Sequence, residues 1–246
     1  ANIAMLFKNE NELQVGVQMN LLNCWICLDE SVSMRGSRWT NAVQGTLHAI
    51  AQLKPIDFLG VVLFGNRVSE FYSGVARDFP SHRLRNKSVT GSSTSLYDAI
   101  LMTLSQALQT QESLKKAIGH RVSIVSYVVV LTDGQDNSSK CSISDVRKLL
   151  GYTAALPGFN IVVAGVGLST TTSQTLASLA RGRNAEFRNL HTAQDIKGLF
   201  EHISLNLEVV RKTKLVGAAI QQGNQALIIT PGQSADSSSD PYSDRQ

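Results

Sequence analysis

Long hydrophobic runs are missing from this sequence of 246 residues. A helix that crosses a bilayer needs about 20 apolar residues, and the apolar stretches here are only as long as β-strands, so no membrane span is expected. Residues 1–8 also lack the leading charge and the long apolar core of a secretory signal. Together with an odd number of cysteines, this favours the cytoplasm slightly as the location of the protein.

Cysteine is scarce. The three cysteines are an odd number, which does not suggest a disulfide framework. Cys24 and Cys27 have the C-x-x-C spacing of redox sites but lie inside an apolar run. Because neighbouring side chains of a strand alternate between its faces, we expect both thiols to be small buried side chains on opposite faces.

Runs of basic residues are absent as well. The net charge of +4 and the pI of about 9.0 are mildly basic, but no aromatic residues are interleaved with basic ones, as they are in proteins that bind single strands. We therefore interpret most of this charge as a solvated surface, and nucleic acid is the less favoured partner.

The usual signatures of enzymes are missing too. No G-x-x-x-x-G-K-[ST] motif occurs, and Gly165 and Gly167 are not followed by the third glycine of a dinucleotide fingerprint. No Ser/His/Asp order with a nucleophile elbow is evident, and no histidine lies in the polar loops described below. Glu30 and Asp136 are the acids near those loops that could act as general bases, but acids in such positions are more often solvated. We expect a protein that is not an enzyme.

What the sequence does contain is a regular alternation of strand and helix patterns, with 43% hydrophobic and 17% charged residues. The expected strands are residues 21–28, 58–65, 68–72, 126–131, 160–167 and 186–190. The expected helices are residues 42–53, 96–108, 143–156, 173–180 and 196–207, with Ser144 or Asp145 expected near the cap of the helix at 143–156. This alternation predicts a Rossmann-like, doubly wound α/β fold, with a mostly parallel sheet and helices on both faces. The short segment 68–72 follows its neighbour closely and is expected to be an antiparallel edge strand.

The expected domain occupies residues 21–210. Residues 1–20 form an N-terminal extension in which 13–17 alternate like an edge strand, and residues 211–230 hold an extra strand, at 226–230, or a linker. Residues 231–246 are rich in Ser, Asp, Pro and Gly. They have too few hydrophobic side chains to offset the entropy of ordering, so we expect a disordered tail.

Three oxygen-bearing side chains follow the first expected strand. Asp29, Ser31 and Ser33 are spaced two residues apart at the point where the strand ends. A loop there can wrap these oxygens around one point, as Mg²⁺ requires. The alternative is that Asp and Ser simply cap the helix that follows.

Two further segments favour the cation site. A polar loop containing Thr94 opens the helix at 96–108, and Asp133 follows the apolar strand at 126–131. In an open parallel sheet, ligands bind outside the carboxyl ends of the strands, where Asp29 and Asp133 are both expected. The order D-x-S-x-S, loop Thr, strand-end Asp resembles the metal-ion-dependent adhesion site of the von Willebrand factor A domain family. The resemblance extends over residues 21–210, with Val32 in place of the usual glycine.

The resemblance implies a function. It implies that Mg²⁺, or else Mn²⁺ or Ca²⁺, is bound by Asp29, Ser31, Ser33, Thr94 and Asp133, and that a Glu or Asp of a partner protein completes the coordination. The expected function is therefore metal-dependent adhesion or complex assembly. A Mg²⁺-dependent hydrolase and a subunit of an RNA- or ATPase-associated complex are the alternatives. Five basic residues are expected in loops near the site, where they could steer an acidic partner: Arg35, Arg38, Arg83, Arg85 and Lys87.

Overall fold

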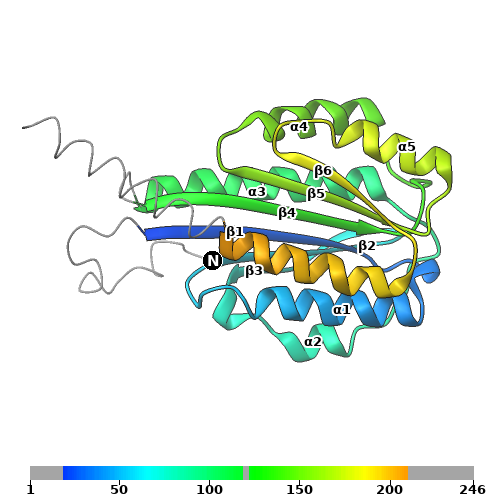
Figure 1. Ribbon diagram of the computed structural model, residues 1–246, viewed down its shortest axis with the longest axis horizontal. Helices are drawn as coiled ribbons and strands as arrows, with labels where there is room; N and C mark the ends of the chain where they lie inside the picture. The colour runs from blue at the N-terminus through cyan, green and yellow to red at the C-terminus, as the bar shows by residue number, and fades with distance from the viewer. Residues whose placement is uncertain (1–18, 119–121, 210–246) are drawn as a thin grey trace, which may run out of the picture.

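The computed structural model describes residues 19–118 and 122–209, which form one six-stranded sheet between two layers of helices (Figure 1). The strand order is β3-β2-β1-β4-β5-β6, and every neighbouring pair is parallel except β2 and β3. The strands are β1 (Met19–Asp29), β2 (Phe58–Phe64), β3 (Val68–Val75), β4 (Val122–Thr132), β5 (Phe159–Val166) and β6 (Ala185–Leu190). The predicted doubly wound fold with one antiparallel edge strand is confirmed.

The helices divide between the two faces of the sheet. Figure 1 shows α1 (Ser37–Ile50), α2 (Ser81–Arg85) and the helix of residues 193–209 on one face. The other face carries α3 (Leu96–Ile118), α4 (Ile143–Ala155) and α5 (Thr170–Leu179). Each face therefore has its own hydrophobic core, as expected for a parallel sheet buried on both sides. None of the helices in these ranges is long and apolar enough to cross a membrane.

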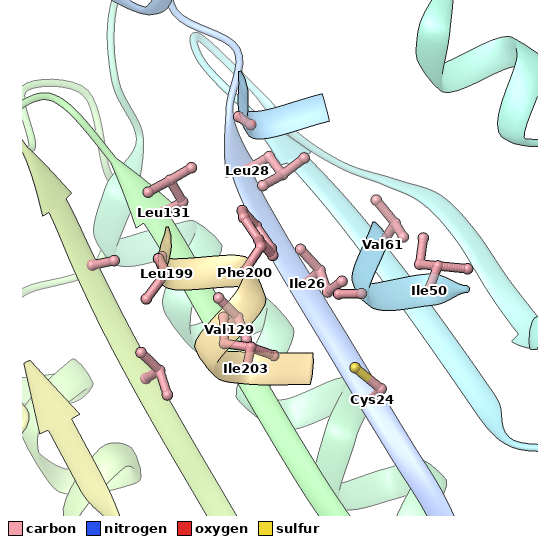
Figure 2. Close-up of a cluster of buried hydrophobic side chains, with 14 of the residues drawn as sticks. Cys24, Ile26, Leu28, Ile50, Val61, Val129, Leu131, Leu199, Phe200 and Ile203 are labelled. Carbon is pink, nitrogen blue, oxygen red and sulfur yellow. The ribbon is translucent and has the colours of Figure 1, made fainter. Parts of the chain in front are cut away.

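Strand β1 supplies both cores because its side chains alternate between the two faces. Cys24 and Ile26 belong to the core beneath the helix of residues 193–209, where Figure 2 shows Phe200 and Ile203 over β1 and β4. Cys27 belongs to the opposite core. Burial raises the pKa of both thiols to about 12, so they remain protonated. The prediction of two buried thiols on opposite faces is confirmed.

The order of the strands places the carboxyl ends of β1 and β4 next to each other at the centre of the sheet. From β1 the chain moves outward to β2 and β3, then returns to β4 on the other side of β1 and continues outward to β6. The carboxyl ends of β1 and β4 are neighbours, with Leu28 paired with Leu131. Adjacent strands whose connections leave in opposite directions create the crevice in which open α/β sheets bind ligands.

Some boundaries differ from the sequence-based expectation. β4 begins at Val122, four residues earlier than expected, because Ser123 interrupts the apolar pattern without breaking the strand. We expected Ser144 or Asp145 near the cap of α4, but the cap is Ser142, whose hydroxyl accepts a hydrogen bond from Asp145 N–H in a capping box. The five-residue helix α2 is too short to show a helical period, and it was not predicted.

The strands expected at 13–17 and 226–230, and the tail, lie outside the described residues.

Two helix glycines offer a matched test of how closely α1 packs. A Cβ atom on Gly45 of α1 would lie 2.4 Å from Cδ2 of Phe200, whereas one on the exposed Gly151 of α4 meets nothing within 4 Å. Gly45→Ala should therefore destabilise the domain by roughly 1–3 kcal/mol through overpacking. Gly151→Ala should stabilise it by about 0.5–1 kcal/mol through helix propensity. Urea denaturation of both variants checks the signs. A stabilising Gly45→Ala would show that Phe200 and the helix of residues 193–209 can shift to accommodate the added methyl group at little energetic cost.

Candidate functional site

Asp29 ends β1 as a buried carboxylate whose two oxygens are both used. Oδ1 accepts a hydrogen bond from Ser31 N–H at 2.8 Å, and Oδ2 accepts one from the Thr132 hydroxyl at 2.7 Å. Burial raises the pKa of the Asp29 carboxyl, and the hydrogen bonds from Ser31 and Thr132 only partly offset this effect. The protein thus holds a carboxylate at a position that disfavours its charge.

The two serines connect β1 to Asp133 through their hydroxyls. A single turn of 3-10 helix, Val32–Met34, curls the chain after Ser31. The Ser33 hydroxyl donates to Asp133 Oδ1 at 2.6 Å, and the Ser31 and Ser33 hydroxyl oxygens are 2.9 Å apart. Since the Ser33 proton is directed at Asp133, Ser31 is the donor of the second bond. Val32, in place of the usual glycine, is accommodated because its side chain is exposed.

Thr94 is held at the same end of the sheet by Asn137. The Thr94 N–H donates to Asn137 Oδ1 at 2.7 Å, and the Thr94 carbonyl accepts from Asn137 N–H at 3.0 Å. Neither bond uses the Thr94 hydroxyl. A Cβ atom on Gly134 would lie 3.4 Å from that hydroxyl oxygen, so Thr94 stands next to the residue that follows Asp133. All five residues singled out in the sequence therefore lie at one end of the sheet.

Arg38 of α1 also reaches this site. Its Nη1 donates to Asp133 Oδ2 at 2.6 Å, and the Asp133 side chain is completely buried while that of Arg38 is 37% exposed. Arg38 Nη1 also contacts the Ser33 carbonyl at 3.4 Å. The guanidinium lies against Gly167, the residue that follows β5, where a Cβ atom would come within 2.9 Å of Arg38 Nη2. The site thus combines two buried carboxylates, three hydroxyl side chains and one cation of its own.

The other basic residues that were expected near the site contact different partners. Lys87 pairs with Glu30 at 3.1 Å, beside Asp29. Arg83 and Arg85 belong to helix α2 and not to a loop, which corrects the sequence-based expectation, and Arg83 stacks over the ring of Phe71. Of the five basic residues expected near the site, Arg38 contacts a predicted site residue directly, through Asp133.

The two acids considered as general bases have structural partners. Asp136 Oδ1 accepts hydrogen bonds from Tyr97 N–H at 3.2 Å and from the Ser139 hydroxyl. Glu30 is paired with Lys87. Both carboxylates are therefore engaged in holding loops, which gives no support to a hydrolytic role.

Sequence reasoning missed two residues of the site, Thr132 and Asn137, and it missed the contact that Arg38 makes with Asp133. Thr132 orients Asp29, Asn137 fixes Thr94, and Arg38 pairs with Asp133. Thr132 and Asn137 stand one and four residues from Asp133, so their proximity was a usable signal. No local sequence signal could have indicated the contact of Arg38 with Asp133, because this contact depends on the direction of α1 relative to the sheet.

The oxygen atoms of this site fit a hard divalent cation. No three side chains of the His, Cys, Asp and Glu types gather to hold a metal within residues 19–118 and 122–209. The site instead offers two carboxylates and three hydroxyls, and hydroxyl and carboxylate oxygens are ligands that Mg²⁺ accepts. The guanidinium on Asp133 shows that a positive charge is already accommodated there.

Solved structures resemble this chain in fold. They include a von Willebrand factor type A protein from Catenulispora acidiphila (16% identity, TM-score 0.57, covering 76% of this chain and 42% of that chain). The ArnB paralog VWA2 from Sulfolobus acidocaldarius shares 18% identity (TM-score 0.51, 74% and 44%). Proximal thread matrix protein 1 from the mussel byssus, described with a zinc-occupied MIDAS motif, shares 16% identity (TM-score 0.53, 76% and 45%). The similar region is less than half of each of these chains.

Sequence comparison assigns the family. No curated protein matches the chain significantly. The family model of the von Willebrand factor type A domain, however, matches residues 23–202, from within β1 into the helix of residues 193–209. This match covers well over half of the chain and includes all five residues of the candidate site. The chain therefore belongs to the von Willebrand factor type A domain family.

Proposed function

We propose that this domain is a divalent-cation-dependent protein-interaction module. In this proposal Asp29, Ser31, Ser33, Thr94 and Asp133 hold Mg²⁺, or else Mn²⁺ or Ca²⁺, and a Glu or Asp of a partner protein completes the coordination. The observation that carries the proposal is the continuous set of oxygens from Asp29 through the two serines to Asp133, at the crevice between β1 and β4.

The chemistry of the donors supports an interaction role. Three of the five side chains are neutral hydroxyls, so a bound cation would keep much of its charge and attract an external carboxylate. The chain's own residues would orient that cation: Thr132 and the Ser31 N–H fix Asp29, and Asn137 fixes the backbone of Thr94. The zinc-occupied motif of the mussel protein supports a divalent ion at the corresponding motif here.

Calorimetric titration with MgCl₂ tests the metal site. The wild-type domain should bind one Mg²⁺ ion, and Ser33→Ala should weaken binding while the domain remains folded. Ser123→Ala, in β4 near the opposite end of the sheet, is the control for loss of a serine hydroxyl and should bind Mg²⁺ like the wild type. Equal Mg²⁺ affinity in Ser33→Ala and the wild type would contradict the assignment.

Thr94→Ala should lower partner affinity more than stability. The hydrogen bonds that position Thr94 go through its backbone and survive the substitution, so the loss of a helix-capping side chain, typically about 1 kcal/mol, is not expected. Partners captured from source lysate in Mg²⁺, and released by EDTA, should bind Thr94→Ala weakly. Thr90→Ala, at an exposed position of the same loop, should retain them. A large loss of thermal stability with normal partner capture would assign Thr94 a structural role only.

A further inference from the structure

Both carboxylate oxygens of Asp133 already accept a hydrogen bond, and one of the donors is a cation. Oδ1 accepts the Ser33 hydroxyl and Oδ2 accepts the Arg38 guanidinium, both at 2.6 Å, and the side chain is completely buried. Charge-assisted hydrogen bonds of this kind are roughly twice as strong as neutral ones. A divalent ion that recruits Asp133, directly or through a water, therefore meets the repulsion of a cation that is already paired with this carboxylate.

The position of Arg38 is prepared by the fold. Gly36, with φ +85°, turns the chain from the 3-10 turn into α1 and so places Arg38 in the first turn of that helix, facing β4. At the other side, Gly167 has no side chain, and a Cβ atom there would come within 2.9 Å of Arg38 Nη2. The guanidinium thus lies in a space bounded by the Ser33 carbonyl, Asp133 and Gly167.

We propose that Arg38 is a built-in competitor for the divalent cation, which must give up Asp133 when the ion binds. The inference rests on the proposed metal site and concerns its regulation. Arg38 neutralises Asp133 in the metal-free domain, which stabilises two neighbouring buried carboxylates without an ion. Since more than a third of its side chain is exposed, the guanidinium can move into solvent without crossing the core. The cost of this movement sets the Mg²⁺ concentration at which the site fills.

Removing Arg38 should therefore strengthen Mg²⁺ binding. We expect the Kd of Arg38→Met for Mg²⁺ to be about tenfold lower than that of the wild type, since a charge-assisted contact no longer has to be broken. Arg35→Met is the matched control, because it removes the same charge from an exposed residue three positions earlier. Because Arg35 is exposed, solvent and salt weaken the effect of its charge far more than that of the partly buried Arg38 contact, so the Kd of Arg35→Met should change much less than that of Arg38→Met.

Calorimetry on the wild type, Arg38→Met, Arg35→Met and Asp133→Ala separates the proposals. Equal Kd values for the wild type and Arg38→Met, with binding lost in Asp133→Ala, would leave the metal site standing and overturn the competition. Absence of Mg²⁺ binding in all four proteins would overturn both. A tenfold gain in Arg35→Met as well would mean that net charge, and not the Arg38 contact, controls affinity, and would also overturn the competition.

A second measurement needs no variant. Phenylglyoxal modifies accessible guanidinium groups, and mass spectrometry locates the modified arginines. Saturating Mg²⁺ should increase the modification rate of Arg38 in the wild-type domain several-fold, because the side chain is released from Asp133, while the rate at the exposed Arg35 stays constant. An Arg38 rate that is unchanged or lower in Mg²⁺ would show that the guanidinium remains on Asp133 and would overturn the proposal.

Discussion

Asp29→Asn should abolish Mg²⁺ binding and yet leave the metal-free domain at least as stable as the wild type. Burial raises the pKa of Asp29, which means that folding disfavours its ionised form. Such a group costs stability above its unfolded-state pKa, and the cost disappears as the pH falls through the higher folded-state value. An amide of the same shape avoids this cost, so Asp29→Asn should unfold at an equal or higher urea concentration at pH 7 in EDTA.

The stability advantage of Asp29→Asn should shrink as the pH falls through the raised folded-state pKa of the wild-type carboxyl and should be lost below its unfolded-state pKa. Asp98→Asn provides the opposite control. Partial burial acts to raise the pKa of Asp98, but hydrogen bonds from Cys141 and Lys140 outweigh it and lower the pKa. Asp98→Asn should therefore be less stable than the wild type at pH 7, and this difference should vanish at low pH. A destabilised Asp29→Asn would show that its hydrogen bonds outweigh the burial of its charge.

Phe200→Ala should cause the largest loss of stability among the substitutions considered. Phe200 is completely buried and packs from the helix of residues 193–209 onto β1, β4 and α1 (Figure 2). Removing a buried aromatic ring typically costs about 3–5 kcal/mol, equivalent to a fall of roughly 10 °C in Tm for a domain of this size. Thermal and urea denaturation measure both quantities.

Leu205→Ala is the control on the same helix, since Leu205 is 61% exposed and should change the free energy of unfolding by less than about 0.5 kcal/mol. A small effect of Phe200→Ala would indicate that this helix is only loosely attached to the sheet. A large effect of Leu205→Ala would instead indicate that the exposed side of the helix is covered in solution.

The fold was predictable because its main signals are local. Continuous apolar runs marked β1, β2, β4 and β5, which are buried on both faces, and helical periodicity marked α3. The cap of α4 was also within reach, because Ser142 and Asp145 have the S-x-x-D spacing of a capping box. The strand ends then placed Asp29 and Asp133 next to each other, since adjacent parallel strands end at the same edge.

The charge balance of the site was not predictable in this way. Which oxygen of Asp133 is taken by Arg38 depends on the direction in which α1 leaves the 3-10 turn and on the space above Gly167. The attachment of Thr94 to Asn137 depends on two loops that are 43 positions apart in sequence. These contacts arise from tertiary packing, and no period or motif of the sequence encodes them.

The hydrogen bonds that join Asp29 to Thr132, Ser33 to Asp133 and Arg38 to Asp133 connect positions 95 to 103 residues apart. A nascent chain that has already exposed β1 and α1 at the ribosome therefore has half of the site and no means of completing it until β4 emerges. In zinc fingers the ligands are close in sequence and the ion drives folding. Here an ion can act only on the finished domain, so we expect Mg²⁺ to prolong the lifetime of the native state without speeding its formation.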